Sequence, residues 1–436
     1  MATSSPQLVM LVSCLAALAV AAGAGEVDGR PKARGFVTAS GARFMAGGRR
    51  FYADGFNAYW LMYMASNPAD RSKVVDVLEQ ASRLGATVVR TWAFSDGQGS
   101  DRPLQITPGV YNEQVFVGLD FVIAEAKKRG IYLILSLVNN MDSFGGKKQY
   151  VKWARDRGHY LGSNDDFFSD ALTQQFYKNH IKFFFLRDMH RIYVISLWLY
   201  VFVEQRMITR VNTFTRVAYK DEPTIFAWEL MNEPRVPSDL SGKTMERWVA
   251  SMSAYVKYVD PKHMVEIGME GFYGESTPER KRFNPGQGYT AGTDFVSNNR
   301  IPTVDFATIH VYPDQWMPGS SSQAQVEFTK RWMASHIEDA GKALRKPLLV
   351  AEFGWSARSG GYTVAARDGY FRMVYDAIYA SVKGNGPCAG GLFWHVMAPG
   401  MESWTDGYDV VFERSPTTAA VVSQECAKID RFTPAV

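Results

Sequence analysis

The chain has 436 residues, of which 46% are hydrophobic and 21% are charged. These proportions are typical of a globular protein with one large domain or two ordinary ones. The formal net charge is only +4, and no run of Lys or Arg stands out. The composition therefore gives no support for a nucleic-acid partner.

The first 24 residues have most features of a secretory signal peptide. The apolar run "LVMLVSCLAALAVAAGAG" ends in small residues around Ala22 and Ala24, as expected before a cleavage site. The residues before it carry no Lys or Arg, so a short anchor or a buried helix remains an alternative. Because the run is too short for a comfortable membrane span, we predict a signal peptide over residues 1–24, a secreted chain and no membrane partner.

Cysteine usage is sparse. Cys14 would leave with the signal peptide, so the mature chain keeps Cys388 and Cys426. These two could pair in an oxidising compartment, but a single pair is not a disulfide framework. The fold must therefore rest on its hydrophobic core.

Short apolar runs that end in polar or aromatic residues recur from about residue 50 onward. There are eight of them, at residues 51–60, 86–94, 131–140, 225–234, 263–272, 305–314, 347–355 and 390–397. Amphipathic helical patterns lie between several runs, such as residues 72–85 and 111–130, each ending in Gly. Alternating buried strands and helices predict a parallel sheet, and eight units fit an α/β fold of the (β/α)8 TIM-barrel type. We expect a single catalytic domain over residues 35–436.

Functional residues of such a barrel project from the C-terminal ends of its strands. The candidates there are Tyr59, Trp60, Arg90, Trp92, Asn139, Asn140, Asn232, Glu233, Glu270, His310, Tyr312, Glu352, Trp355 and Trp394. Glu233 and Glu352, after the fourth and seventh strands, would face one another across the mouth. Two carboxylates roughly 5 to 5.5 Å apart suit retaining glycoside hydrolysis, in which one protonates the leaving oxygen and the other attacks the anomeric carbon.

Four segments carry a resemblance to a known family. "VVRTWAFSDG", "YKDEPTIFAWELMNEPR", "VAEFGW" and "GGLFW" occur in this order on the second, fourth, seventh and eighth predicted strands. They resemble glycoside hydrolase family 5 and, within it, the β-mannanases of plants, from about Gly35 to the C-terminus. The resemblance implies that Glu233 is the acid/base and that Glu352 is the nucleophile. Because cleavage by two carboxylates does not require a cofactor, we expect none.

The same resemblance implies roles for six further residues. Asn232 would bind the sugar 2-hydroxyl, and Arg90 and Tyr312 would hold Glu352 ionised. His310 would support the site, while Trp92 and Trp394 would line the sugar subsites. The expected substrates are mannan, galactomannan and glucomannan. The enzyme is expected to act on them outside the cell, in the cell wall or apoplast.

Structural interpretations compete with several of these roles. Arg90 could be an ordinary ion-pair partner and His310 a core histidine, whereas Glu270 matches no catalytic motif and is expected to be structural. The tryptophans that could equally pack or contact a ligand are Trp60, Trp316 and Trp404. The seven histidines are scattered without a His-x-x-x-His pair, so we expect no metal site.

Two departures from the family pattern remain. Residues 183–208 form an apolar and aromatic insertion, too short to span a membrane. It is either a real helix extension or interaction hairpin, or untranslated sequence read through in the gene model, because an exposed apolar patch of this kind promotes aggregation. The second departure is His395, which stands where the resembling enzymes usually carry a polar amide.

The sequence thus predicts a secreted, endo-acting hydrolase of β-1,4-mannan that works with two carboxylates. A family 5 cellulase is the nearest alternative, because both polymers have equatorial β-1,4 links. A non-catalytic glycan-binding protein, disabled by the insertion, is the alternative from another class. The sequence gives no oligomeric state.

Overall fold

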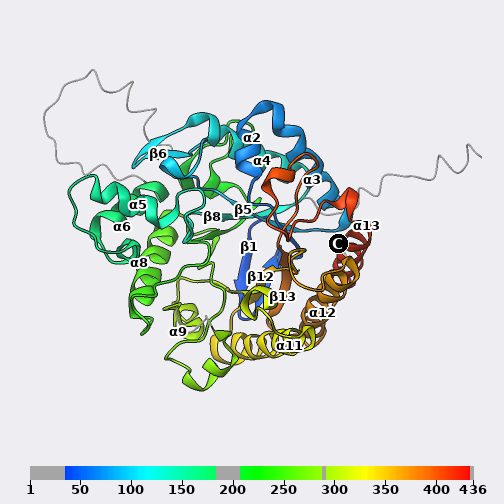
Figure 1. The fold of residues 1–436 in the computed structure, drawn as a ribbon. Coiled ribbons are helices and arrows are strands. Elements are labelled where there is room, and N and C mark those ends of the chain that lie inside the picture. Colours follow the sequence, from blue (N-terminus) through cyan, green and yellow to red (C-terminus); the bar gives the residue numbers. More distant parts are fainter. Residues whose placement is uncertain (1–34, 183–206, 287–290, 433–436) are drawn as a thin grey trace, which may run out of the picture. The chain divides into compact units, whose positions relative to one another are not determined.

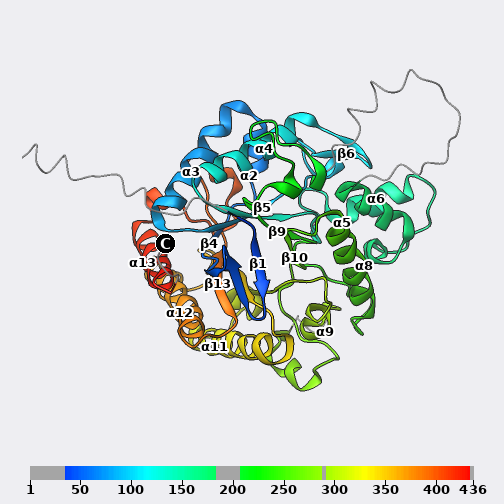
Figure 2. The ribbon, with the colours of Figure 1, turned by 180° about the vertical axis from the view of Figure 1, so that it is seen from behind.

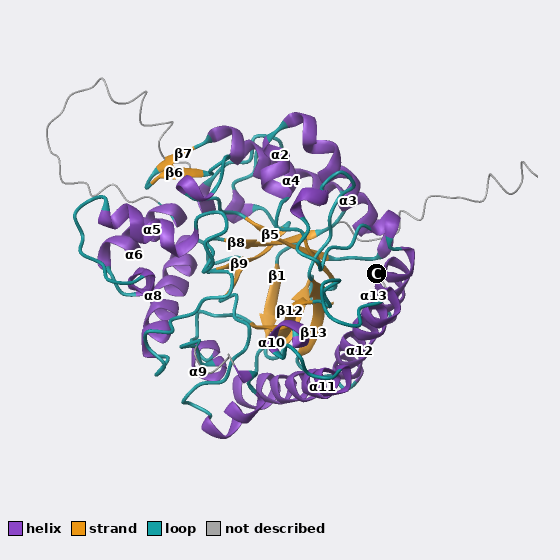
Figure 3. Cartoon of the chain, in the orientation of Figure 1, coloured by secondary structure: helices purple, strands orange, loops and turns teal. Residues whose placement is uncertain are grey.

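The computed structural model describes residues 35–182, 207–286 and 291–432, which belong to one unit, Ala33–Val436. Its centre is an eight-stranded parallel sheet with helices around it, so the predicted TIM barrel is confirmed (Figures 1 and 3). In chain order the barrel strands are β4 (Gly55–Asn57), β5 (Val88–Trp92), β8 (Tyr132–Ser136), β9 (Ile225–Glu229), β10 (Met264–Glu266), β11 (Ala307–Val311), β12 (Leu348–Phe353) and β13 (Cys388–Phe393). Seven of them lie within the predicted runs, and β13 begins two residues before the eighth run, 390–397.

The ladder of the sheet is interrupted at one place, between β10 and β11, which are its two ends. Other hydrogen bonds bridge this gap. The backbone N–H of Asp305 donates to Val265 O at 2.8 Å, and the N–H of His310 donates to Glu270 O at 3.0 Å. The barrel is therefore nearly closed, and Glu270 is brought to the mouth by the irregular segment after β10.

Helices cover the outside of the barrel (Figure 3). They are α2 (Leu61–Ser66), α3 (Arg71–Leu84), α4 (Glu113–Lys128), α5 (Gly146–Arg155), α6 (Ala171–Ile181), α8 (Lys243–Val259), α9 (Phe295–Asn299), α11 (Ser322–Asp339), α12 (Val364–Lys383) and α13 (Pro416–Asp430). The short helix α10 (Pro313–Trp316) instead lies at the mouth, directly after β11. α3 and α4 confirm two predicted helices, and α3 ends at Gly85 with φ of 96°, a left-handed conformation that favours glycine. None of the helices in the described ranges has both the length and the apolar character needed to span a membrane.

A small antiparallel sheet that the sequence did not predict covers the N-terminal end of the barrel (Figure 2). It consists of β1 (Val37–Ser40), β2 (Arg43–Ala46) and β3 (Arg49–Phe51). Phe44 of β2 packs edge-on against Phe226 and Phe306, with ring centroids 5.1 Å away in each case. The apolar ends of the barrel strands are thereby removed from water. A second hairpin, β6 (Gln105–Thr107) and β7 (Val110–Tyr111), was also not predicted.

Three features considered from the sequence remain: the cysteine pair, the signal peptide and the insertion. Cys388 and Cys426 are both buried, and no disulfide joins them to each other, so the pairing left open from the sequence is not formed in this structure. The signal peptide over residues 1–24 and residues 183–206 of the insertion lie outside the described residues. The last two residues of the insertion, Met207 and Ile208, begin a buried 3-10 turn, Met207–Thr209.

Candidate active site

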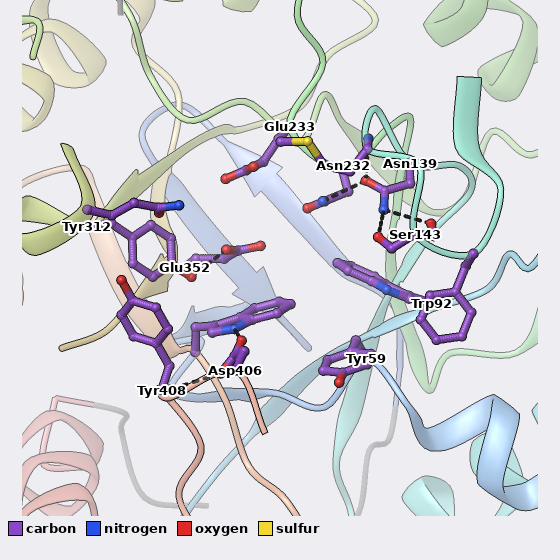
Figure 4. A pocket seen from close by; sticks show the side chains of 14 residues that line it. Tyr59, Trp92, Asn139, Ser143, Asn232, Glu233, Tyr312, Glu352, Asp406 and Tyr408 are labelled. Atoms are coloured by element: carbon purple, nitrogen blue, oxygen red, sulfur yellow. Dashed lines mark hydrogen bonds between the residues drawn. The ribbon is translucent and has the colours of Figure 1, made fainter. Parts of the chain in front are cut away.

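A cavity of about 430 Å³ opens at the C-terminal ends of the strands (Figure 4). The residues that line it are Tyr59, Trp92, Asn139, Met141, Ser143, Phe144, Asn232, Glu233, Tyr312, Gln315, Glu352, Trp394, Asp406 and Tyr408. Six of the eight predicted site residues are among them. The other two, Arg90 and His310, are fully buried directly beneath the cavity.

The two predicted carboxylates come together in this cavity, as Figure 4 shows. Glu352 lies near the end of β12, and Glu233 follows β9 with a left-handed φ of 49°, a conformation that is uncommon for a residue with a side chain. A carboxylate oxygen from each, together with a ring nitrogen of His310, lie within 4.8 Å of one another. This separation is close to that of the carboxylate pair in retaining glycosidases.

Arg90 of β5 holds the nucleophile candidate in place. Its Nη1 donates to Glu352 Oε1 at 2.6 Å, and its Nη2 donates to Asn232 Oδ1 at 2.7 Å. The hydroxyl of Tyr312 donates to the other oxygen of Glu352, also at 2.6 Å. Both oxygens of Glu352 are thus fixed by strong donors.

The amide of Asn232 is oriented from both sides. Its Oδ1 accepts from Arg90, and its Nδ2 donates to Asn139 Oδ1 at 3.0 Å. Asn139 is itself anchored, because its Nδ2 donates to Ser143 Oγ at 2.9 Å. Within the described residues the Asn232 amide donates one hydrogen bond, and Asn232 lines the cavity, so its second N–H is available to a sugar hydroxyl.

Two buried glutamates beneath the site were missed by the sequence analysis. Glu229 of β9 accepts from Nε and Nη2 of Arg90, the latter at 2.7 Å, and Glu266 of β10 pairs in register with Glu229. Burial and the charge of Glu229 raise the pKa of Glu266 well above its ordinary value. The signal was present in the sequence, since both are acids inside otherwise apolar runs.

The charges around Glu233 and Glu352 set the protonation of the site. Burial raises the pKa of Glu352, and the charge of Glu233 adds to this, although His310, Arg90 and Tyr312 act against it; the net pKa is raised. Burial also acts to raise the pKa of Glu233, but the hydrogen bond and charge of His310 bring it below its ordinary value. The resemblance makes Glu233 the proton donor, which requires its protonated form. In the free site, however, the pKa of Glu233 is lowered and that of Glu352 is raised.

The position of His310 explains why the pKa of Glu233 is lowered. Its Nδ1 lies 2.8 Å from Glu233 Oε1 and 3.5 Å from Glu352 Oε2. Burial acts to lower the pKa of His310, but the two carboxylates raise it above its ordinary value. With Nδ1 close to both acids, His310 is part of the site rather than an ordinary core histidine.

An aromatic wall closes the opposite side of the cavity. The rings of Tyr59 and Trp394 are nearly parallel, with an interplanar angle of 8° and centroids 5.6 Å apart, and Trp92 lies 5.9 Å from Trp394. The indole N–H of Trp394 donates to Asp406 Oδ2 at 2.7 Å, and His395 Nε2 lies 3.1 Å from Asp406 Oδ1. Asp406 was missed, because nothing in its loop sequence marks it as a partner of Trp394.

Other candidates at the strand ends do not line the cavity. Trp60 is fully buried and donates to Val396 O, and Trp316 packs among Phe272, Phe328 and Trp332. Trp404 packs against Tyr63, 4.8 Å away. Glu270 pairs with Arg235; burial and then the charge of Glu233 raise its pKa to about 7. For these residues the structural interpretation is favoured.

A metal ion would have to use Glu233, His310 and Glu352, the group of potential ligands that the described residues bring together. The donors present fit a cation poorly. Arg90 and Tyr312 already occupy the oxygens of Glu352, His310 Nδ1 is directed at Glu233, and the Arg90 guanidinium repels a cation. The same three groups suit proton transfer.

Comparison with known proteins decides the family. Residues 34–408 match the family described as GH family 5 beta-mannosidase-like. The chain belongs to glycoside hydrolase family 5. A relative from Oryza sativa subsp. japonica, whose name mannan endo-1,4-beta-mannosidase 9 is provisional, is 64% identical over 99% of this chain and 98% of its own length. Mannan endo-1,4-beta-mannosidase 4 of Solanum lycopersicum is 50% identical over 91% of this chain and 92% of its own.

Solved structures of family 5 agree with this placement. An endo-beta-1,4-mannanase from Thermotoga petrophila has a TM-score of 0.70 and 31% identity, over 87% of this chain and 77% of the bacterial one. An endo-1,4-beta-mannanase from Rhizomucor miehei has a TM-score of 0.69 and 28% identity, over 90% and 99% of the two chains. The (β/α)8 fold and family membership are thus shown by sequence and by structure.

Proposed function

We propose that this chain is an endo-acting hydrolase of β-1,4-mannan that retains the anomeric configuration. The observation that carries the proposal is the carboxylate pair, Glu233 and Glu352, with oxygens within 4.8 Å of each other in an open cavity. The spacing leaves no room for a water between them, as an inverting enzyme would need. The names of the family 5 relatives supply the substrate class.

The first step forms a covalent intermediate. Glu352, held by Arg90 and Tyr312, attacks the anomeric carbon through a carboxylate oxygen and forms an ester bond. The bond from that carbon to the glycosidic oxygen breaks, and Glu233 gives its proton to this oxygen. The leaving chain departs as an alcohol, while Glu233 becomes a carboxylate.

The second step releases the bound sugar. Glu233 accepts a proton from a water molecule, whose oxygen bonds to the anomeric carbon as the ester bond breaks. The product keeps its original anomeric configuration because the carbon has been inverted twice. Glu352 returns as a carboxylate, and Glu233 is protonated again.

His310 supplies Glu233 with its proton at the start. The two are joined by the 2.8 Å contact between Nδ1 and Oε1. Moving the proton along this contact gives neutral Glu233 and neutral imidazole, which removes the cation that lowers the pKa of Glu233.

The substrate would lie against the aromatic wall formed by Tyr59, Trp92 and Trp394. Flat apolar rings suit the faces of sugar rings, and amide, carboxylate and phenol groups on the other side suit their hydroxyls. We further infer that residues 1–24 direct the chain to the cell wall or apoplast. This inference is supported by the apolar run and small residues of that segment.

The proposal is tested with the purified chain on unbranched β-1,4-mannan and on carboxymethyl cellulose. We expect new reducing ends from mannan, with the β-anomer formed first when the products are followed by NMR. Faster hydrolysis of carboxymethyl cellulose would make the chain a cellulase, and tight mannan binding without new reducing ends would make it a glycan-binding protein. Expression with and without residues 183–206 separates poor folding caused by the insertion from a wrong function.

A further inference from the structure

The guanidinium of Arg90 joins two buried acids at different edges. Its Nη1 donates to Glu352 Oε1 at 2.6 Å, while Nε and Nη2 donate to the two oxygens of Glu229 at 2.5 and 2.7 Å. Nη1 also donates to Asn57 Oδ1 at 2.9 Å and Nη2 to Asn232 Oδ1 at 2.7 Å, so all five N–H groups are used. Because the pairing with Glu229 is bidentate, it fixes the plane of the guanidinium. The direction in which Arg90 meets the nucleophile candidate is therefore set from Glu229.

Glu229 is itself supported by Glu266. The two residues lie in register on β9 and β10, and both are fully buried. Their carboxyl groups are hydrogen-bond partners, and since an ionised carboxylate only accepts, such a bond needs a proton on one of the two acids. Glu266 Oε2 accepts from the N–H of Gly268 at 2.5 Å, and no partner of Oε1 other than this acid lies in the described ranges. Oε1 of Glu266 is thus a free position for the proton.

The surroundings favour the proton on Glu266 rather than on Glu229. Burial acts to raise the pKa of Glu229, but the charge and hydrogen bonds of Arg90 bring it below its ordinary value. Glu266 lacks such a contact, and its pKa is raised by burial and by Glu229. Tyr177 of α6 also faces Glu229, and burial keeps its phenol neutral by raising its pKa. A single negative charge therefore lies behind Arg90.

That charge matters for the nucleophile candidate because few other groups reach it. Burial and then Glu233 act to raise the pKa of Glu352, whereas His310, Arg90 and the hydrogen bond of Tyr312 act to lower it. A guanidinium without a counter-charge at 2.6 Å would hold the carboxylate far more strongly. A carboxylate held in that way is a weaker base and a weaker nucleophile.

We propose that Glu229 is a positioning residue for the nucleophile: it aims Arg90 at Glu352 and offsets part of the Arg90 charge, while a neutral Glu266 donates a hydrogen bond that keeps Glu229 in place. The inference rests on the proposed two-carboxylate hydrolysis and adds two residues to it. Neither Glu229 nor Glu266 lines the catalytic cavity. Both act through Arg90 and do not touch the substrate.

The test measures kcat/KM against pH on dinitrophenyl β-mannobioside. Its leaving group needs no proton from Glu233, so the acid limb of the profile reports the ionisation of Glu352 in the free enzyme. Glu229→Gln removes the charge behind Arg90 and should move this limb down by about one pH unit. The plateau of the profile should fall by about 10²-fold, the scale expected for a displaced catalytic group. Glu229→Asp keeps the charge on a shorter side chain, so its plateau should fall while its limb stays in place.

Two further variants separate the roles of charge and hydrogen bonding. The amide N–H of Glu266→Gln can donate to Glu229 as a neutral acid does, so the acid limb should not move. Its infrared spectrum should lose one carbonyl band of a protonated carboxyl group relative to the wild type. The matched control is Glu222→Gln, which changes a fully buried acid before the other end of β9, paired with Lys127 at 2.9 Å. This control should leave the acid limb where it is.

Other results overturn the inference. An unmoved acid limb in folded Glu229→Gln shows that the charge of Glu229 does not act on Glu352. If Glu229→Gln does not fold, Glu229→Asp decides, because a wild-type plateau there contradicts the positioning role. A moved limb or an unchanged carbonyl band in Glu266→Gln shows that Glu266 is ionised. A wild-type chain that cleaves neither mannan nor the mannobioside contradicts the proposed function instead, so the two failures are distinguished.

Discussion

The two ends of the barrel are built from opposite kinds of side chain. The N-terminal end is closed by rings from β1–β3 and the strand starts, with Phe44 against Phe226 and Phe306. The C-terminal end places Arg90, Glu229 and Glu352 together, buried and charged. Burying apolar rings stabilises the fold, whereas burying charges costs free energy unless each is paired. One end therefore maintains the barrel, and the other performs the chemistry.

The largest effect is expected at the mouth. Glu352→Ala should lower mannan turnover by roughly 10⁵-fold, the scale of losing a covalent nucleophile. The melting temperature should shift little, because Arg90 keeps its pairing with Glu229. Reducing-end release and thermal unfolding measure the two quantities. Glu327→Ala, at an exposed position of α11, is the control, and near-normal turnover of Glu352→Ala would show that the assignment is wrong.

Glu233→Gln should give the next largest loss, and one that depends on the substrate. Turnover of mannan should fall by about 10²- to 10⁴-fold, the usual contribution of a general acid. An aryl mannobioside with a good leaving group should lose much less in its first step, because its leaving oxygen needs no proton. Single-turnover rates on both substrates measure this difference. Equal losses on the two would argue against Glu233 as the acid.

At the opposite end, Phe44→Ala should change stability and not chemistry. Removing a fully packed ring should lower the free energy of unfolding by about 3 to 5 kcal/mol, while kcat per folded molecule stays the same. Urea unfolding and active-site titration measure the two. Phe214→Ala is the matched control, since that ring is 47% exposed. A lower kcat with unchanged stability would break the contrast between the two ends.

The buried carboxyl of Glu270, at the mouth, is expected to lower the free energy of unfolding at neutral pH. Its folded pKa of about 7 lies above the ordinary 4.5, so its contribution to folding is complete below pH 4.5 and is lost as the pH rises through 7. Glu270→Gln should remove this loss, which amounts to at most about 3 kcal/mol. Unfolding free energies at pH 5 and pH 8 test it. A variant with the wild-type pH slope would refute the prediction.

The smallest effect is expected in the aromatic wall. Asp406→Ala removes the acceptor of the Trp394 indole N–H and should lower kcat/KM on mannan about fivefold, the worth of one hydrogen bond. Asp406→Asn keeps a carbonyl oxygen and should retain most of the activity. Steady-state kinetics on mannan measure kcat/KM for both variants. If Asp406→Asn loses as much as Asp406→Ala, the charge next to His395 matters more than the hydrogen bond.

Many residues at the mouth could be predicted from the sequence, because each apolar strand run ends in polar or aromatic residues. The apolar run up to Leu230 stops at Asn232 and Glu233, and a second run stops near Glu352. In a parallel barrel such ends converge on one face. His310 and Tyr312 could be found in the same way, since they also stand at a strand end.

The remainder depended on contacts between strands that are distant in the chain. Glu229 and Glu266 look like misplaced acids until the register of β9 and β10 sets them side by side beneath Arg90. Trp60 and Trp394 look alike in the sequence, yet one packs in the core and the other lines the cavity. Asp406 becomes part of the aromatic wall only through its bond to Trp394.

The sequence by itself determined the fold class, the family and the pair of acids, because apolar periodicity and local motifs are properties of short segments. Only the tertiary structure decided which residues share the buried charge network, how His310 lies between Glu233 and Glu352, and which aromatic rings line the cavity. These depend on distances between side chains on different strands and loops. Burial and charge act through those distances, so the pKa shifts in the site follow from how the barrel brings these side chains together.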